Sequence, residues 1–271
     1  WDVCGIGAQP ATGESNYRQV DLLDEEGLRQ ALAEWQPDAV AHLAGIAFVG
    51  HGDADAFYRV NLLGTRHLLA ALADAPKRPS CVLLASSANV YGNSMAGVLN
   101  EASPVSPAND YAVSKLAMEH MARLWLDKLP VVIARPFNYT GVGQAESFLL
   151  PKIVAHFRRG ADAIELGNLD VWRDFSDVRA VTQAYRVLLE MAPAGETVNV
   201  CSGQTHSPRE VVAMAEGISG RRMQVQVNPA FVRANEVKTL CGDPGKLRGI
   251  VGSTWQTPPL AETLRWMLEA P

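Results

Sequence analysis

The stretch LLASSANVYGNS, residues 83–94, begins as an apolar run and stops at two adjacent serines. A short apolar run bounded by small polar residues is typical of a buried strand. Over about the first 150 residues such runs alternate with helical patterns, and this alternation predicts βαβ units with right-handed crossovers. The predicted strands are residues 3–7, 39–43, 81–86 and 131–134. The sequence therefore predicts an α/β fold with a doubly wound parallel sheet.

Helical patterns separate these strands, and their first residues suit helix N-termini. Asp24 suits the start of the first helix and Asp110 the start of the third. After Phe137 the segments become shorter and glycine and proline recur, with one more helix starting near Asp177 and an amphipathic helix at the end, PPLAETLRWMLEA. The predicted helices of the first part are residues 24–33, 54–73 and 110–126.

Composition excludes several classes of protein. With 271 residues, 48% of them hydrophobic, the chain can bury a large core. No apolar run approaches the ~20 residues of a membrane span, and the N-terminus lacks the basic-then-apolar pattern of a signal peptide. A net charge of -5 and a pI near 5.7 argue against a nucleic-acid surface. We expect a soluble, cytoplasmic protein that binds neither membrane nor nucleic acid.

The cysteines and histidines show no metal-site spacing. Cys4, Cys81, Cys201 and Cys241 lack CxxC and CxxH spacing, so they predict neither a zinc site nor a disulfide framework. We expect all four to be small buried side chains. The six histidines form no HxxxH pattern, and no metal is expected.

A second motif, NDYAVSKLAMEH (109–120), sets Tyr111 and Lys115 four residues apart in a helix-forming segment. Four residues make about one helical turn, so both side chains leave the same face. A cation ~4 Å from a phenol favours phenolate by up to ~4 kcal/mol at an effective dielectric of ~20, which lowers a phenol pKa that is normally ~10. Tyr111 would then be a usable general acid or base near neutral pH. The alternative is an amphipathic helix that carries both residues by chance.

The serines of the first motif supply a third partner. A hydroxyl at a strand end beside such a helix can hydrogen-bond the carbonyl oxygen that Tyr111 would protonate. Together with AHLAG, VNLLGTRHLL and ARPFNYTGVGQ, these motifs resemble the extended short-chain dehydrogenase/reductase family of nucleotide-sugar enzymes, over nearly the whole chain. The resemblance implies a Rossmann-like NAD(P)-binding domain over residues 1–145. It also implies a mainly substrate-binding region over residues 146–271, with some return crossings to the Rossmann sheet.

One part of that fold has no counterpart in the sequence. A Rossmann sheet normally opens with a strand and a Gly-rich turn whose amides hold the pyrophosphate. This sequence begins at WDVCGIG, which looks like the second strand, and it contains no GxGxxG. We expect the first βα unit to be absent from it. Neither an acidic residue nor an arginine directly follows that strand, so the choice between NAD and NADP stays open.

By motif position, the resemblance makes Ser87 the substrate-orienting hydroxyl and Tyr111 the acid/base. Lys115 would lower the tyrosine pKa and hold the nicotinamide ribose. The implied cofactor-binding residues are Asp21, Leu22, Leu43, Ala44, Gly45, Asn61, Ser86, Tyr111, Lys115, Pro136 and Phe137. Structural alternatives stay open, with Asp21 a turn residue, Asn61 a helix-packing amide and Ser87 a strand-end cap.

The residue two positions after Ser87 bears on the reaction. Dehydratases of this family place a glutamate there, because removing a sugar proton and expelling a hydroxyl group needs a carboxylate. Here the position is Asn89, which cannot exchange that proton at neutral pH. The sequence therefore predicts hydride transfer without dehydration.

The second region resembles GDP-sugar sites. RANEVKTLCGDPGKLRGIVG looks like the segment that binds GDP in GDP-mannose dehydratases and GDP-4-keto-6-deoxy-mannose reductases, and the helix in SFLLPKIVAHFRRG could hold a diphosphate at its N-terminus. The implied substrate-binding residues are Ser87, Asn89, Asn138, Ser147, Phe148, Arg173, Arg233 and Glu236. The alternatives are an ion pair of Arg173 with Asp174 or Asp177, and an exposed helix or turn position for Glu236.

The resemblance thus implies an NAD(P)H-dependent reductase of the 4-keto group of GDP-4-keto-6-deoxy-D-mannose, giving GDP-D-rhamnose or GDP-6-deoxy-D-talose. One alternative is a nucleotide-sugar 4-epimerase with tightly bound NAD, since the same three side chains serve both reactions. Another is a non-catalytic nucleotide-sugar-binding protein without the cofactor turn. In the family, the helices matching 54–73 and 110–126 form a four-helix contact, so a homodimer is expected.

Overall fold

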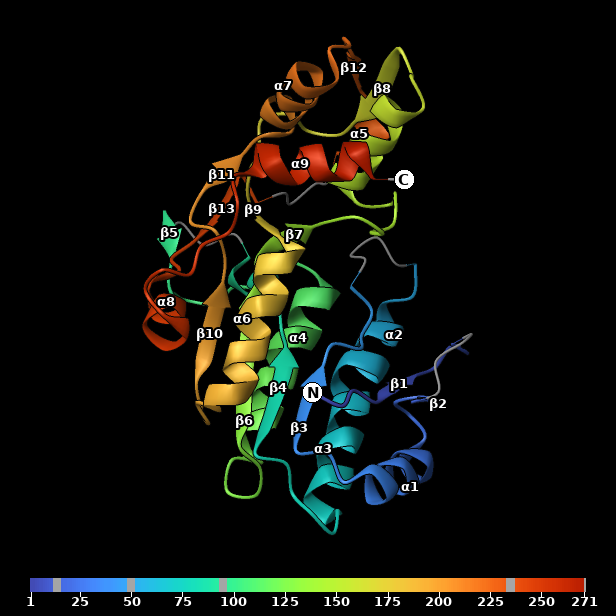
Figure 1. Ribbon diagram of the computed structural model, residues 1–271, viewed down its shortest axis with the longest axis vertical. Helices are drawn as coiled ribbons and strands as arrows, with labels where there is room; N and C mark the ends of the chain where they lie inside the picture. Colours follow the sequence, from blue (N-terminus) through green and yellow to red (C-terminus); the bar gives the residue numbers. More distant parts are fainter. Residues whose placement is uncertain (12–15, 48–51, 93–96, 233–236, 271) are drawn as a thin grey trace. The chain divides into compact units, whose positions relative to one another are not determined.

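The computed structural model describes residues 1–11, 16–47, 52–92, 97–232 and 237–270 (Figure 1). The chain forms two compact units and passes between them several times. Unit 1 consists of Trp1–Val90, Pro107–Arg135 and Val187–Val198, and unit 2 of Tyr91–Ser106, Pro136–Arg186 and Asn199–Pro271. The predicted division after residue 145 stays a prediction.

Unit 1 is built around a sheet in the order β10-β6-β4-β3 (Figure 1). Its strands are β3 (Ala39–His42), β4 (Cys81–Ala85), β6 (Val131–Pro136) and β10 (Thr197–Val200). β3 pairs with β4, and β4 with β6, in parallel, which confirms the predicted parallel α/β arrangement. Because parallel strands end at the same edge, the segments after β3 and β4 come together, and ligands bind at this edge in open α/β sheets.

A separate two-stranded parallel sheet pairs β1 (Gly5–Gly7) with β2 (Tyr17–Gln19). β1 is shorter than the predicted strand 3–7, and β2 was not predicted. A Cβ at Gly5 would lie 2.9 Å from the ring of Tyr17, and one at Gly7 would lie 2.5 Å from its hydroxyl oxygen. The two glycines therefore let the tyrosine ring lie directly across β1.

The helices of unit 1 are α1 (Glu25–Trp35), α2 (Ala54–Phe57), the π-helical segment η1 (Tyr58–Gly64), α3 (Thr65–Asp74) and α4 (Asp110–Arg123). The predicted helix 54–73 is present, but its middle is widened into the π-helical η1. α1 and α3 lie side by side (Figure 1). Apolar side chains from these helices, the sheet and the adjoining loops form the core, among them Val20, Leu28, Leu32, Leu68, Leu69, Leu72, Val82, Leu84, Met118, Leu129, Val131 and Ile133.

Capping side chains fix where the helices of unit 1 begin. Asp24 caps α1 as predicted, since its carboxylate accepts a hydrogen bond of 3.0 Å from the amide of Gly27. α4 begins at Asp110, as predicted, but the capping side chain comes from the residue before it. The cap is Asn109, whose extended backbone lets its side-chain oxygen accept from the amide of Ala112 at 2.9 Å.

Unit 2 is centred on β9, which pairs in parallel with β7 and β13 and antiparallel with β11. Its strands are β5 (Val98–Leu99), β7 (Asn138–Thr140), β8 (Ala163–Leu166), β9 (Trp172–Asp177), β11 (Thr205–His206), β12 (Gln224–Val227) and β13 (Thr239–Gly242). β13 also pairs with β5, and β12 pairs with β8.

The remaining helices lie wholly or partly in unit 2 (Figure 1). They are the α-helices α5 (Leu149–Arg158), α6 (Val178–Met191), α7 (Pro208–Ser219), α8 (Gly245–Val251) and α9 (Leu260–Glu269), and the 3-10 turns η2 (Ala88–Tyr91) and η3 (Pro229–Phe231). α6 and α9 confirm the helices predicted near Asp177 and at the end of the chain. Apolar side chains of α5, α7 and α9 form one core with β8, including Ile153, Phe157, Ile164, Val211 and Leu264.

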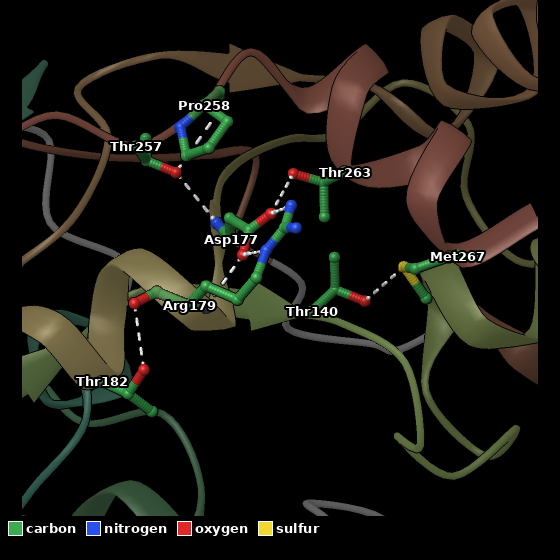
Figure 2. A network of polar contacts seen from close by, with 8 residues as sticks. All are labelled: Thr140, Asp177, Arg179, Thr182, Thr257, Pro258, Thr263 and Met267. Atoms are coloured by element: carbon green, nitrogen blue, oxygen red, sulfur yellow. Dashed lines mark hydrogen bonds and ion pairs between the residues drawn. The ribbon is translucent and has the colours of Figure 1, made fainter. Parts of the chain in front are cut away.

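A polar network at the end of β9 joins three segments of unit 2 (Figure 2). The buried carboxylate of Asp177 accepts hydrogen bonds from the amide and guanidinium of Arg179 and from the hydroxyl of Thr263 at 2.8 Å. The amide of Asp177 donates to Thr257 at 2.9 Å, and the Arg179 guanidinium lies 3.9 Å from the ring centre of Trp266. This carboxylate therefore ties the start of α6 to α9 and to the segment that precedes it.

Two further observations bear on the composition. None of the helices in the described ranges is long and apolar enough to cross a membrane. The cysteines are free thiols, and Cys81, Cys201 and Cys241 are buried as predicted. The prediction was wrong for Cys4, which is exposed because it precedes β1 in a segment that the core does not cover.

Candidate active site

Ser87, Tyr111 and Lys115 all belong to unit 1, at the carboxyl-end edge of its sheet. Ser87 follows β4 by two residues, and Tyr111 and Lys115 lie in the first two turns of α4. The ammonium of Lys115 donates to the carbonyl oxygen of Ala85 at 2.8 Å, so α4 is fastened to the last residue of β4. All three predicted catalytic side chains are buried, with at most 7% of their surface exposed.

The Tyr111 ring is held by an aromatic neighbour. Phe57, the last residue of α2, packs against it edge to face, with ring centres 5.9 Å apart and planes at 61°. Edge-to-face packing fixes a ring without covering its polar tip. The orientation of the phenol therefore comes from the helix that precedes η1.

The pKa of the Lys115 ammonium is lower than that of an ordinary lysine. Burial lowers the pKa of Lys115 to about 8, and the negative charge of Glu119, one turn along α4, works against this effect. His42 is also buried near Lys115, and burial together with the lysine charge lowers its pKa to about 3. His42, bonded to Thr65 at 2.9 Å, is therefore neutral near pH 7 and leaves Lys115 as the charged group of the pair.

The hydroxyl of Ser87 has a defined hydrogen-bonding role. Its oxygen accepts from the backbone amide of Asn89 at 3.1 Å and from the Asn89 side-chain amide at 3.2 Å. A serine hydroxyl offers two acceptor lone pairs and one proton. With both lone pairs used by Asn89, Ser87 is set to donate its proton, as a group that binds a carbonyl oxygen or an alkoxide must.

Asn61 and Gly45 shape the surface beside Lys115. Asn61, fully buried in η1, accepts from the amide of Ile46 at 2.9 Å and donates to its carbonyl at 3.2 Å and to Ser114 at 3.1 Å. A Cβ at Gly45 would lie only 2.7 Å from the Asn61 amide oxygen and 3.3 Å from the Lys115 nitrogen. Gly45 itself is exposed, so bare backbone faces outward beside the lysine. This arrangement fits a nicotinamide cofactor, which needs backbone that a ligand can approach closely.

The other predicted cofactor residues differ in their surroundings. Leu43 and Ala44 are exposed after β3, next to Gly45. Asp21 accepts from the amide of Leu23 at 2.8 Å, which is a turn contact, and Leu22 packs against Gly64 of η1. The Asp21 geometry suits the structural alternative, and its contact with adenine stays a prediction.

Ser86, Pro136 and Phe137 are all buried. The hydroxyl of Ser86 donates to Glu119 at 2.6 Å. Pro136 and Phe137 belong to unit 2, where the Phe137 ring packs 6.2 Å from that of Tyr91. Their roles at the cofactor stay predictions.

The predicted substrate residues of unit 2 occupy several elements. Asn138 lies in β7 and donates to the carbonyl of Asp174 at 3.2 Å. Ser147 and Phe148 directly precede α5, and Phe148 offers no side-chain hydrogen bond to the first-turn amides. Arg173 donates to the carbonyl of Trp172 at 2.9 Å. The predicted residues Arg233 and Glu236 lie outside the described residues.

The structural alternative for Arg173 was an ion pair with Asp174 or Asp177. In the structure, each of these two carboxylates bonds to groups other than Arg173. Asp177 pairs with Arg179. Asp174, which is fully buried, accepts from the amides of Ser202, Gly203 and Gly242 at 2.8, 2.9 and 3.2 Å. Burial raises the pKa of Asp174, and these bonds oppose the rise.

Sequence reasoning missed three side chains around the triad. The Ser114 hydroxyl accepts a hydrogen bond from the Asn61 side-chain amide, and Glu119 and Arg135 form a buried ion pair beside Ser86. A signal was present for Glu119, because it lies four residues after Lys115 and so shares its helix face. No local signal existed for Arg135, which approaches from β6.

A parallel α/β sheet that carries a serine, a tyrosine and a lysine at this edge defines a Rossmann-fold oxidoreductase of the short-chain dehydrogenase/reductase type. Residues 7–259 match the family described as GDP-mannose 4,6 dehydratase. The chain belongs to this family.

Relatives of known activity are similar over most of their length. The GDP-6-deoxy-D-talose 4-dehydrogenase of Aggregatibacter actinomycetemcomitans is 33% identical over 244 residues, which cover 90% of this chain and 83% of that protein. The GDP-6-deoxy-D-mannose reductase of Pseudomonas aeruginosa is 37% identical over 243 residues, which cover 86% and 79%.

Solved structures agree with this placement. A Burkholderia cenocepacia J2315 protein, provisionally described as an epimerase, has a TM-score of 0.90 and 56% identity, and the match covers 97% of this chain and 86% of that one. RMD from Pseudomonas aeruginosa, complexed with NADPH, has a TM-score of 0.84 and 31% identity over 98% of both chains.

Proposed function

We propose that this protein reduces the 4-keto group of GDP-4-keto-6-deoxy-D-mannose with NADPH or NADH, to give GDP-D-rhamnose or GDP-6-deoxy-D-talose. The observation that carries the proposal is the pair formed by Ser87 and Asn89. The Ser87 hydroxyl is set to donate, and the residue two positions later, Asn89, carries an amide instead of the carboxylate that dehydration needs. The two relatives of known activity act on the same class of GDP-6-deoxy sugar.

The surroundings of the residues support the following proposed roles. A bound nicotinamide cofactor supplies hydride, and Gly45, Asn61 and Lys115 would hold it. The Ser87 hydroxyl donates a hydrogen bond to the oxygen on C4 and stabilises the negative charge that develops there. Tyr111 gives its proton to that oxygen, and the nearby Lys115 cation favours the phenolate that remains. Solvent then returns a proton to Tyr111 with the help of Lys115.

Unit 2 supplies candidates for holding GDP. The first-turn amides of α5 follow Ser147 and Phe148 without a side-chain cap, and helix N-termini favour phosphate. Arg173 and Arg233 supply positive charge for the diphosphate, and Glu236 supplies a carboxylate for ribose hydroxyls. These assignments rest on the family resemblance.

The substitution Tyr111→Phe tests the mechanism. Without the phenolic proton, turnover should fall to background, while the melting temperature stays near that of the parent because the ring and its contact with Phe57 remain. Cofactor oxidation with the keto sugar measures the first, and a thermal melt the second. Turnover at the parent rate in this variant would refute the proposed roles.

A second candidate is a nucleotide-sugar 4-epimerase with tightly bound NAD, which the 56% identity to the provisional epimerase favours. The two functions differ in what happens to the cofactor. An epimerase regenerates its NAD in each cycle and needs none added, whereas a reductase consumes reduced cofactor. Measuring NAD retained after purification, and turnover without added cofactor, separates them.

We also propose that the protein is a homodimer. Val113 on α4 and Leu63 in η1 are exposed apolar side chains, with 39% and 44% of their surface accessible. A dimer through α4 and the α2–α3 segment would cover them. Light scattering should give twice the chain mass for the parent, and the monomer mass for Val113→Glu combined with Leu63→Glu.

The cytoplasm is the proposed location, because the buried free thiols of Cys81, Cys201 and Cys241 suit a reducing compartment. Cell fractionation with an antibody against the protein tests this.

A further inference from the structure

Glu119 and Arg135 form a buried ion pair next to Ser86, the residue that precedes Ser87. Glu119 is fully buried in α4, and Arg135 of β6 is 4% exposed. The guanidinium of Arg135 donates to both carboxylate oxygens, at 2.9 and 2.6 Å. Ser86 donates to the same carboxylate at 2.6 Å. Glu119 is therefore fully engaged, by one hydroxyl and one bidentate guanidinium.

These contacts fasten the end of β4 to α4 at two consecutive residues. Lys115 donates to the carbonyl of Ala85, and one turn further along the helix Glu119 accepts from the side chain of Ser86. The next residue is Ser87. Because Lys115 and Glu119 leave the same helix face, the two contacts fix both the distance and the rotation of the strand end against α4. The position of the Ser87 hydroxyl relative to the tyrosine helix depends on both.

Glu119 also acts on Lys115 through its charge. The carboxylate stands one turn from the ammonium and favours its charged form. The other titratable neighbours are Tyr111 on the same helix, His42 of β3, which is neutral, and Arg135 behind Glu119. Asn61 and the Ala85 carbonyl are uncharged. Glu119 is thus the anion among these neighbours that sustains the lysine charge against burial.

We propose that Glu119, held by Arg135, is a positioning residue with two effects. It anchors Ser86, so that Ser87 keeps its place beside α4, and its charge keeps Lys115 protonated at the pH of turnover. The proposal rests on the proposed function for its effect on turnover. Its effect on Lys115 is a property of the free protein.

Two variants separate the effect of the Glu119 charge from that of its side-chain shape. Glu119→Gln keeps an oxygen that can accept from Ser86 but removes the charge, and it leaves Arg135 buried without its partner. Glu119→Gln combined with Arg135→Met removes both charges and relieves that penalty, so the double variant should melt closer to the parent than the single one. Asp38→Asn is the matched control, because it removes one carboxylate at the exposed turn before β3, at the opposite edge of the same sheet.

The first measurement is an NMR titration of the full chain labelled with ¹³C at the lysine ε position, with the Lys115 resonance assigned by Lys115→Arg. The parent should titrate near pH 8. Loss of a unit negative charge one turn away implies a fall of roughly one pH unit in Glu119→Gln, and a smaller fall in the double variant, because removing the Arg135 cation offsets part of the loss. Asp38→Asn should titrate like the parent. An unchanged Lys115 midpoint in both Glu119 variants would overturn the inference.

The second measurement is the pH profile of kcat/KM with the keto sugar. Its alkaline limb should move to lower pH by the same amount in the Glu119 variants, and kcat should fall at least tenfold with little change in KM. A purely structural role would lower stability without moving the limb, and that outcome would also overturn the inference. If the parent itself shows no reduction, the proposed function fails, and the NMR titration still decides the inference.

Discussion

The direction of a single hydroxyl governs what the site can do. Ser87 accepts two hydrogen bonds from Asn89, and this leaves its proton to be donated, in the proposed mechanism to the oxygen on C4. A carboxylate at position 89 would instead compete for that proton. The side chain at position 89 therefore bears on the reaction: an amide that donates to Ser87 suits reduction, and a carboxylate suits dehydration.

Replacing Ser87 by alanine should lower kcat by roughly 10²- to 10³-fold, because a donor to the developing oxyanion is lost. Ser87→Thr keeps the hydroxyl and should retain most of the activity. Steady-state kinetics with the keto sugar measure both. Equal losses in the alanine and threonine variants would show that the hydroxyl is not what matters.

Gly45 is the position where a single added carbon should disturb the cofactor. The Cβ of Gly45→Ala would lie 2.7 Å from the Asn61 oxygen, so the loop or Asn61 has to shift beside Lys115. Displacement on this scale costs roughly 10- to 100-fold in kcat/KM for the cofactor. Gly52→Ala is the matched control, since its Cβ would meet no atom within 4 Å. Similar kinetics for the two variants would contradict the assignment.

At this scale, the sequence predicts residues whose spacing along one element carries the information. Tyr111 and Lys115 follow from helix periodicity, and the serine from the end of an apolar strand. The partner of Ser86 could not be predicted, because Glu119 is 33 residues away along the chain and Arg135 a further 16. Contacts between elements depend on how a helix packs on its sheet, and the local sequence pattern does not indicate this packing.

Among the elements, the junction of β9 and α6 depends on Asp177. Its carboxylate accepts from the amide of Arg179 at the start of α6 and from Thr263 of α9 (Figure 2). Asp177→Ala should lower the free energy of unfolding by about 2 kcal/mol or more, from the lost helix cap and the unpaired partners. Thr182→Ala, which removes an exposed hydroxyl bonded within α6, should change it by less than about 0.5 kcal/mol. Chemical denaturation tests both.

The same carboxylate should make stability depend on pH. Burial alone would raise the pKa of Asp177, but bonds from Arg179 and Thr263 outweigh it and the pKa is lowered. Its charged form therefore stabilises the fold above the unfolded pKa of ~3.9, and this contribution is lost as the pH falls through the folded pKa. The difference in unfolding free energy between the parent and Asp177→Asn should shrink below about pH 4. A difference that stays constant with pH would contradict this account.

The elements were predictable to different degrees. Long helical patterns predicted α1, α4, α6 and α9, and buried apolar runs predicted β3, β4 and β6. β2 was missed because it has only three residues, two of them partly buried, and carries no clear periodicity. The widening of the helix at η1 was also invisible, since its sequence continues the helical pattern and Asn61 acquires its partners only when α4 packs beside it.

For the whole molecule, the chain repeatedly leaves one unit and returns to the other. Unit 1 carries the three catalytic candidates and the exposed backbone at Gly45, and unit 2 carries the residues proposed for GDP. In the proposed function, this division separates the chemistry, which is shared across the short-chain dehydrogenase/reductase class, from substrate choice. It explains why the sequence motifs identify the reaction type more directly than the sugar.

The most direct test of the central claim is an assay with GDP-4-keto-6-deoxy-D-mannose and either NADPH or NADH. Loss of reduced cofactor is followed by absorbance, and the product is identified by NMR. The account predicts stoichiometric cofactor oxidation and a GDP-linked 6-deoxyhexose, whose configuration at C4 distinguishes rhamnose from 6-deoxytalose. No oxidation with either cofactor, together with interconversion of C4 epimers on retained NAD, would contradict it.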